Sequence, residues 1–321
     1  MAIFFLKNSE IDLKAWDKCI AGSFNGSICA FSWFLDLISE DWGALVEGDY
    51  ESVMPLILQR FLGKEIIGLP PFAYDLGIFS NHPITPDKTH AFIEAVPPGF
   101  RYYRLMLNKY NPLDCKDCRT ILHRRFELDL ILPYFKLSAG YTPDLSRRLN
   151  ITMANGYYFS PGLSPNELIS LIDKNRIPAP RIIKKHDYRL LRTIIAGLIR
   201  HNSGELYGLF DRHNEISSVA LVAWMNNRIN LVFQATTPDK INDFPDLFLI
   251  DRIIDKYSET NTTFLFDSGF IMNYPVLFKE FGARETTSIE VFQNKLTFPR
   301  NLLIHYRIFN TCLSSSQSSS N

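Results

Sequence analysis

Three short runs between residues 205 and 235 decide the fold of this 321-residue chain. They are Glu205–Phe210 (ELYGLF), Ser217–Trp224 (SSVALVAW) and Ile229–Ala235 (INLVFQA). Each run is rich in aliphatic, β-branched and aromatic residues, and the polar linkers between them are short enough to form hairpin turns. This stretch therefore predicts an antiparallel meander of three strands.

The residues after the meander alternate between helix and strand signals. Candidate helices at Leu247–Tyr257 and Val276–Phe281 alternate with candidate strands at Thr263–Phe266 and Ser288–Phe292. The first part of the chain gives a similar series of two short helices, three strands, a helix and two strands. The fold class predicted is α/β (α+β), with two halves that each hold a mixed, mostly antiparallel sheet flanked by helices.

The length of the chain also favours two halves, because single cores usually stop growing below 321 residues. We expect an N-terminal half at residues 1–140 and a C-terminal half at 181–310. A helical segment at 141–180 would join them. The tail at 311–321 is rich in serine, and this composition is typical of disorder.

Composition and charge exclude several classes of protein. The 34 basic and 34 acidic residues give a net charge of zero, so no overall positive field attracts nucleic acid or an anionic membrane. No stretch approaches the roughly 20 apolar residues of a membrane-spanning helix. The N-terminal residues lack the basic start and apolar core of a signal peptide. We therefore expect a cytoplasmic protein without a membrane span.

The cysteines are odd in number and scattered, unlike those of a disulfide-stabilised secreted domain. They are Cys19, Cys29, Cys115, Cys118 and Cys312. We expect them to have no disulfide partner. The C-x-x-C pair Cys115 and Cys118 would supply half of a zinc site, and His123 follows nearby, but no second C-x-x-C or H-x-x-x-H pair completes it. The sequence therefore predicts no metal.

The predicted order of elements is similar to that of the GNAT N-acyltransferase fold. Two such halves in one chain resemble the FemABX family of peptidoglycan aminoacyltransferases, and in particular FemAB-like proteins of the Bacteroidetes. The likeness extends to about Phe309. The segments that carry it are Phe31–Asp36, Val53–Leu56, Leu76–Ser80, Arg147–Asn150, Phe266–Gly269 and Phe278–Ala283.

This resemblance implies transfer of an acyl or aminoacyl group to an amine in a cleft between the two halves. The implied donor is an aminoacyl-tRNA, and the implied acceptor is a small molecule or a cell-wall precursor. An amine can attack such an activated carbonyl directly, with backbone N–H groups stabilising the oxyanion. Two alternatives stay open: a non-catalytic ligand-binding protein on the same scaffold, and an N-acyltransferase of a small metabolite or lipid precursor that uses acyl-CoA or an acyl carrier.

The stretch Thr236–Asp246 disfavours coenzyme A as the donor. A GNAT enzyme that uses acetyl-CoA holds the pyrophosphate on the N–H groups of a glycine-containing loop and on the start of the following helix. The stretch in this chain has no glycine, two prolines without N–H groups, and several side-chain carboxylates and amides. We expect no tightly bound cofactor and poor binding of acyl-CoA.

The resemblance also indicates candidate site residues. Arg147 and Arg148 match the arginine-and-asparagine start of the family's inter-half helix, where they would bind a phosphate or carboxylate, unless they are solvated arginines on a helix face. Asp267 follows a predicted strand and would accept a proton from the attacking amine. Equally, the sequence Asp-Ser-Gly is ordinary turn chemistry.

Three further residues complete the candidate site. Tyr74 and Asp75 precede Leu76–Ser80, at a place where the similar proteins have amide side chains in a substrate cleft. Gln234, late in the third strand of the meander, would donate a hydrogen bond to the carbonyl of the donor. The alternative for Gln234 is a polar side chain on the outer face of an alternating strand.

Overall fold

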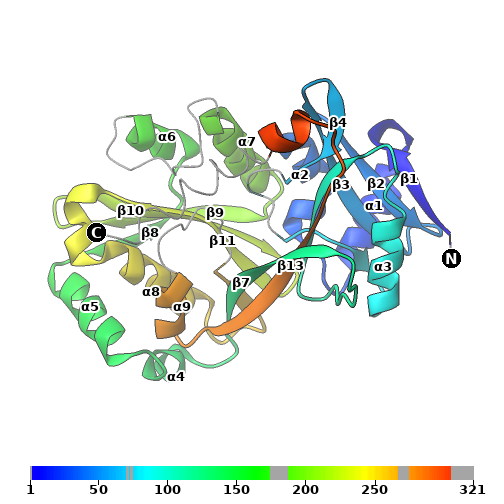
Figure 1. Ribbon diagram of the computed structural model, residues 1–321. Coiled ribbons are helices and arrows are strands. Elements are labelled where there is room, and N and C mark those ends of the chain that lie inside the picture. Colours follow the sequence, from blue (N-terminus) through cyan, green and yellow to red (C-terminus); the bar gives the residue numbers. More distant parts are fainter. Residues whose placement is uncertain (1, 70–71, 73–74, 174–186, 267–274, 305–321) are drawn as a thin grey trace. The chain divides into compact units, whose positions relative to one another are not determined.

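The computed structural model describes residues 2–69, 72, 75–173, 187–266 and 275–304 (Figure 1). The chain forms two compact units, one of residues 1–124 and 287–321 and one of residues 125–286. Our expected boundaries at 140 and 180 followed the order of the elements along the chain, whereas the compact units follow strand pairing. Strand β13 (Arg284–Asn294) pairs with β6 (Tyr102–Leu107), so most of β13 belongs to the first unit although it comes late in the sequence.

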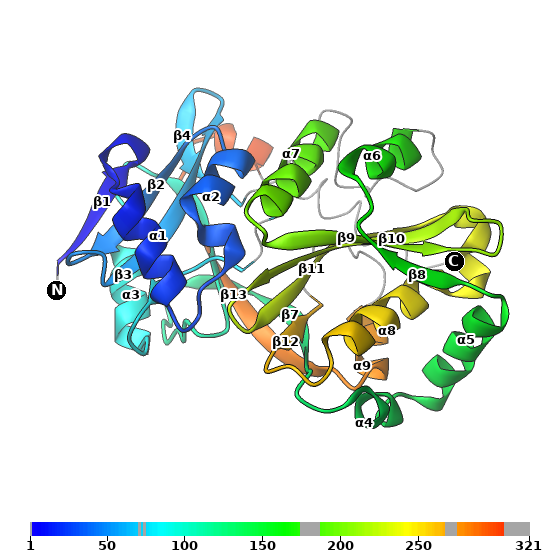
Figure 2. The same ribbon diagram turned by 180° about the vertical axis from the view of Figure 1, so that it is seen from behind.

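The first unit contains a sheet with the strand order β1-β2-β3-β4-β6-β13, and β5 pairs with β3. The remaining strands are β1 (Ile3–Lys7), β2 (Trp42–Glu47), β3 (Ser52–Phe61), β4 (Lys64–Ile67) and β5 (Phe79–Ser80). Among these described strands, only β4 and β6 run parallel. Helices α1 (Leu13–Gly22) and α2 (Ser32–Ile38) cover one face (Figure 2), and α3 (Pro86–Glu94) packs Phe92 into the core with Leu45 and Met54.

A charged cluster of the first unit joins β6, β13 and the part of β7 (Arg119–Asp129) before residue 125. Glu290 of β13 is fully buried, and its Oε1 accepts a hydrogen bond from Arg104 Nε at 2.5 Å. Its Oε2 accepts from Arg104 Nη2 at 2.9 Å and lies 2.9 Å from His123 Nε2 of β7. Burial alone would raise the pKa of Glu290, but His123 and Arg104 hold that pKa at about 2.

The second unit contains a sheet with the strand order β7-β12-β11-β10-β9-β8. Its other strands are β8 (Tyr158–Pro161), β9 (Gly204–Phe210), β10 (Ile216–Met225), β11 (Arg228–Thr236) and β12 (Thr263–Leu265). The antiparallel pairing of β9, β10 and β11 confirms the predicted meander. Strand β12 runs parallel to β11, so the sheet is mixed, and the predicted fold class is confirmed.

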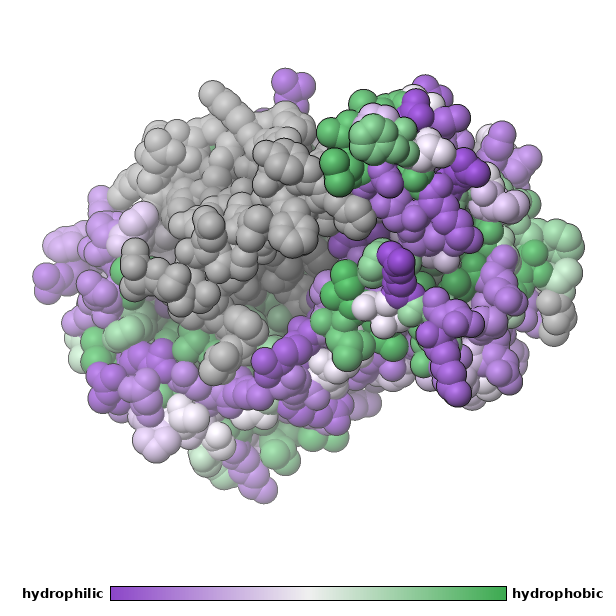
Figure 3. All heavy atoms as spheres, in the orientation of Figure 1, coloured by the Kyte–Doolittle hydropathy of each residue, from purple (hydrophilic) through white to green (hydrophobic). Residues whose placement is uncertain are grey.

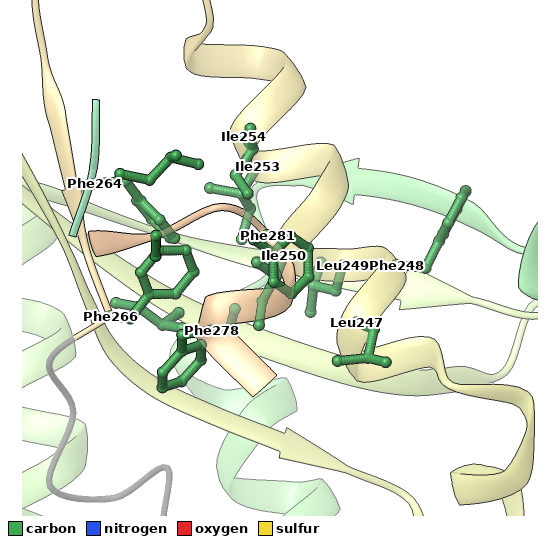
Figure 4. Close-up of a cluster of buried hydrophobic side chains, with 14 of the residues drawn as sticks. Leu247, Phe248, Leu249, Ile250, Ile253, Ile254, Phe264, Phe266, Phe278 and Phe281 are labelled. Carbon is green, nitrogen blue, oxygen red and sulfur yellow. The ribbon is translucent and has the colours of Figure 1, made fainter. Parts of the chain in front are cut away.

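Helices lie on both faces of this sheet, as Figures 1 and 2 show. They are α4 (Tyr134–Ala139), α5 (Pro143–Ala154), α6 (Pro165–Asp173), α7 (Asp187–Arg200), α8 (Pro245–Tyr257) and α9 (Pro275–Glu280). The fully buried Leu191 and Leu198 lie on α7, which contacts β9. On the other face, Ile250 and Ile253 of α8 pack in one core cluster with Phe264 and neighbouring aromatic rings (Figure 4).

A β-bulge changes the alternation of β11. Leu221 of β10 lies opposite Phe233, but its neighbour Val222 lies opposite Leu231, so Val232 is an extra residue. In an uninterrupted strand, residues 231 and 234 would face opposite sides of the sheet. With the bulge, Leu231 packs in the core beneath α8 while Gln234 also reaches α8. The bulge therefore turns a polar side chain toward the start of that helix.

The cysteine prediction is wrong in one respect. Cys115 and Cys118 form an intrachain disulfide, in the loop between β6 and β7. Their Cα atoms are 5.4 Å apart, which is inside the usual range for a disulfide. The C-x-x-C spacing suggested half of a zinc site. It could not show that the loop brings the two sulfur atoms within bonding distance.

Two findings concern ions and membranes. In the part of the chain that the structure describes, no three His, Cys, Asp or Glu side chains gather as metal ligands would. None of the helices in the same ranges is long and apolar enough to cross a bilayer. On the one face that Figure 3 draws, the coloured atoms are a mixture of hydrophilic and apolar residues.

Candidate functional site

Two candidate residues of the second unit, Arg148 and Gln234, meet at the start of α8. Strand β11 ends at Thr236, a 3-10 helix follows at Pro238–Asp243, and Phe244 adopts a left-handed conformation with φ 56° before Pro245 begins α8. Gln234 Nε2 donates a hydrogen bond to the carbonyl oxygen of Asp246 at 2.8 Å. This hydrogen bond joins the end of β11 to the first turn of α8.

Helix α5 and the chain after it hold the 3-10 helix from the other side. Thr152 of α5 is fully buried, and its hydroxyl donates to the backbone carbonyl of Asp243. Tyr157 Oη donates to Asp243 Oδ2 at 2.7 Å. Burial and the Asp243 carboxylate raise the pKa of Tyr157, which therefore remains a hydrogen-bond donor at neutral pH.

Beside this loop, β11 extends past its parallel neighbour. The register between β11 and β12 runs from Arg228 opposite Thr263 to Asn230 opposite Leu265, while β11 continues to Thr236. Among the described residues, no strand pairs with that continuation on the β12 side. The bulge at Val232 lies within it. Backbone N–H groups near such a break in the ladder are suited to hold a developing oxyanion.

Asp246 is a carboxylate in an unusual electrostatic position. The start of a helix normally lowers the pKa of an acidic group. Here burial of the carboxyl group raises the pKa of Asp246, although the N–H groups of Leu247 and Asp246 and the charge of Arg148 lower it. A carboxylate with a raised pKa is a stronger proton acceptor than an ordinary one.

Arg148 and Arg147 differ in their surroundings. The Arg148 side chain is 11% exposed, and its Nη2 lies 2.9 Å from Asp144 Oδ2 and also bonds the carboxylate of Glu280. Its guanidinium lies 5.7 Å from the centre of the Phe244 ring. Arg147 is 63% exposed and pairs with Asp144 Oδ1 at 2.7 Å. Neighbours on a helix diverge by about 100°, so only Arg148 contacts the described residues at the start of α8.

The structure resembles that of FemX. The TM-score is 0.64 at 11% sequence identity, and the match covers 95% of this chain and 100% of FemX. The chain has a FemABX-like double-GNAT fold. This confirms the resemblance inferred from the order of elements.

Two further solved structures share the double-GNAT fold. The C-terminal domain of a putative lysylphosphatidylglycerol synthetase from Agrobacterium fabrum has a TM-score of 0.53 at 11% identity, covering 92% of this chain and 96% of that one. A conserved protein of unknown function from Bacteroides thetaiotaomicron VPI-5482 has a TM-score of 0.51 at 7% identity, covering 88% and 98%. No protein-family model matches the chain, and no curated protein matches it.

The structure brings together two of the six predicted site residues. Arg148 and Gln234 both lie at the start of α8, whereas Arg147 points to an exposed side of α5. Asp75 lies in the first unit and is partly buried. Tyr74 and Asp267 lie outside the described residues.

The sequence did not indicate Asp246 or Tyr157 as site residues. Asp246 follows Pro245, and acidic residues are common in the first turn of any helix. Tyr157 meets Asp243 across 86 positions of sequence, which no local pattern reveals. The usual warning of a bulge is a glycine within a strand, and INLVFQA contains none.

Proposed function

We propose that the protein is a GNAT-type acyltransferase or aminoacyltransferase that joins an activated acyl group to an amine. The observation that carries this proposal is the bulge at Val232, which turns Gln234 toward the backbone carbonyl of Asp246. Among the described residues, no strand pairs with this end of β11 on the β12 side. The amide of Gln234, the carboxylate of Asp246 and the bulge at Val232 then lie within one short segment of the chain. These are the groups that direct amine attack on a carbonyl requires.

In the proposed reaction the acceptor nitrogen attacks the carbonyl carbon of the donor while Asp246 takes the proton of the amine. The resulting oxyanion would be held by backbone N–H groups around the bulge. Collapse of the intermediate breaks the bond to the oxygen or sulfur of the donor, which takes the proton from Asp246 and leaves as an alcohol or thiol. Gln234 orients the donor and the first turn of α8. Arg148 acts as a positioning residue, because Asp144 and Glu280 already share its guanidinium.

The proposed donor is an aminoacyl ester carried by tRNA, and the proposed acceptor is a small-molecule or cell-wall-precursor amine. Support for these classes comes from the likeness to FemX and from the resemblance to the FemABX family. A tRNA-borne donor would place the reaction in the cytoplasm. The exposed Arg147 is available for an anionic part of either substrate, since its ion pair among the described residues is with the equally exposed Asp144.

The direct test is transfer of a labelled aminoacyl group from charged tRNA to an amine acceptor by the purified full-length protein. We expect Gln234→Ala to lower kcat/KM about tenfold, the value of one lost hydrogen bond near 1.4 kcal/mol. Gln59→Ala, at an exposed position of β3, is the matched control and should leave the rate unchanged. Equal rates for the two variants, or no transfer from any charged tRNA, would contradict the proposal.

Acetyl-CoA is expected to bind more weakly than about 10 μM, equivalent to about −7 kcal/mol. Pro245 has no N–H group, and the first free N–H groups of α8 already face the carboxylate of Asp246. The lysine of the 3-10 helix, Lys240, is engaged by the buried Asp211 at 3.2 Å. Calorimetric titration checks this prediction, and a tighter dissociation constant would make acyl-CoA the better donor.

A further inference from the structure

The second unit contains a pocket of about 760 Å³ at the other end of the meander from Asp246. It lies beside the hairpin that joins β10 to β11, whereas the candidate active site lies beyond the last residue of β11. The side chains that determine which ligand the pocket can bind lie near the carboxyl end of α8 and on strands β9, β10 and β11. They are Glu205, Trp224, Ile229, Tyr257, Thr260 and Thr262.

The pocket exists because β8 leaves the sheet early. The last pair between β8 and β9 is Pro161 with Tyr207, and the chain then turns away at Gly162, which has a φ of +82°. Among the described residues, Gly204 and Glu205 at the start of β9 have no strand partner on that side, so they form an edge of the described sheet. A side chain has no room at position 204, because a Cβ there would lie 2.9 Å from both Leu198 Cβ and the carbonyl oxygen of Val222. Glycine therefore allows the close approach of these neighbours.

Glu205 lines the pocket, and one of its two carboxylate oxygens is held by hydrogen bonds. Its Oε2 accepts a hydrogen bond from Tyr207 Oη at 2.5 Å and from Lys256 Nζ at 3.1 Å. Tyr207 is fully buried, and its hydroxyl also lies 2.8 Å from that of Tyr257. Among the described residues, no hydrogen bond or ion pair to Oε1 is recorded. The carboxylate is therefore held in one orientation by Oε2 while Oε1 keeps its capacity to accept.

The aromatic residues around Glu205 are suited to a cation. Lys256 Nζ lies 4.5 Å from the centre of the Tyr207 ring and 5.6 Å from that of Tyr257, so one ammonium group already sits over these rings. Trp224, which lines the pocket, offers the aromatic face that attracts cations most strongly. Of the described residues that line the pocket, Glu205 alone is charged, so an anion would find no counter-charge among them.

We propose that this pocket binds a small organic cation, a protonated amine carried on an aromatic or apolar body. The ammonium group would donate to Glu205 Oε1, and the body would lie against Trp224 and Ile229. Hydroxyl groups on the body would meet the polar lining groups Thr260 and Thr262. This site is separate from the proposed active site and does not depend on the proposed transferase activity.

The probe for the test is tyramine, titrated calorimetrically into the full-length protein at pH 7. Its matched controls are 4-ethylphenol, which lacks the charge, and 3-(4-hydroxyphenyl)propionate, which reverses it. We expect tyramine to bind at least about tenfold more tightly than either, as expected for a charge-assisted hydrogen bond. Equal affinity for the three compounds, or no binding of tyramine, would overturn the proposal.

Variants separate a binding role of Glu205 from a structural one. Glu205→Gln should weaken tyramine binding at least about tenfold, and Glu94→Gln, an exposed glutamate of the first unit, should not change it. Lys256→Met removes the competing ammonium but keeps the apolar stem over Tyr207, so it should strengthen binding by about threefold. If Lys256→Met folds but binds tyramine more weakly, the ion pair between Lys256 and Glu205 only maintains the shape of the pocket. That result would overturn the proposal even if Glu205→Gln failed to fold.

Discussion

Asp246→Asn is expected to slow group transfer by about 10²- to 10⁴-fold, the usual effect of removing a general base. The carboxylate accepts the proton of the attacking amine, and an amide cannot. Because burial raises the pKa of Asp246, the acidic limb of the wild-type pH–rate profile should lie above the pH at which an ordinary aspartate titrates. The variant should lose that limb. Steady-state kinetics across pH measures both effects.

The same substitution is expected to raise the melting temperature at pH 7. A carboxyl whose pKa is raised in the folded state stabilises the fold only while it is protonated, and this contribution is lost as pH rises through the folded-state pKa. The amide that replaces the carboxyl is neutral at every pH, so the variant should gain stability near neutrality and lose that advantage in acid. Asp239→Asn, an exposed acid of the same loop, is the control. Unchanged kinetics with unchanged stability would contradict both predictions.

Glu290→Gln is expected to lower the free energy of unfolding by about 3 kcal/mol at pH 7, because one pKa unit corresponds to about 1.4 kcal/mol. The pKa of Glu290 is about 2, against an ordinary value of 4.5. A carboxyl whose pKa is lowered by folding stabilises the protein above its unfolded pKa, and that stabilisation is lost as pH falls through the folded pKa. The difference between variant and wild type should therefore shrink between about pH 4.5 and pH 2.

Urea unfolding at several pH values, followed by hydrogen exchange in β6 and β13, measures this difference. Glu285→Gln on the same strand is the matched control, because Glu285 is 33% exposed and pairs with Lys279, which is 49% exposed. Pairs of this kind contribute about 0–1 kcal/mol, so the control should be nearly neutral. A loss of stability in Glu290→Gln that is independent of pH would show that packing, and not the charge between Arg104 and His123, accounts for the effect.

The order of helices and strands was predictable because it depends on local patterns. The runs at Glu205–Phe210, Ser217–Trp224 and Ile229–Ala235 are bounded by polar turns, and they pair as expected. These signals act within a few residues, where periodicity and turn chemistry are strong. The predicted likeness to a double-GNAT fold rests on the same signals.

The site was predictable only in part, because it depends on contacts between distant segments. The sequence left two interpretations of Gln234, a donor to the substrate or a polar side chain on an outer face of the strand. The bulge at Val232 turns the side chain toward the start of α8. Arg148 was selected together with Arg147, but contact with Phe244 distinguishes them. Burial in the folded chain raises the pKa of Asp246. No pattern within one segment carries this information.

The division of the first unit into two stretches of sequence has a consequence for the order of folding. The second unit, residues 125–286, is continuous and can complete its own contacts as soon as it leaves the ribosome. The first unit is synthesised earlier but lacks β13, whose Glu290 lies between Arg104 and His123, until residues 287–294 emerge. During synthesis the edge of β6 that β13 will occupy therefore stays open, so the unit that begins first is finished last.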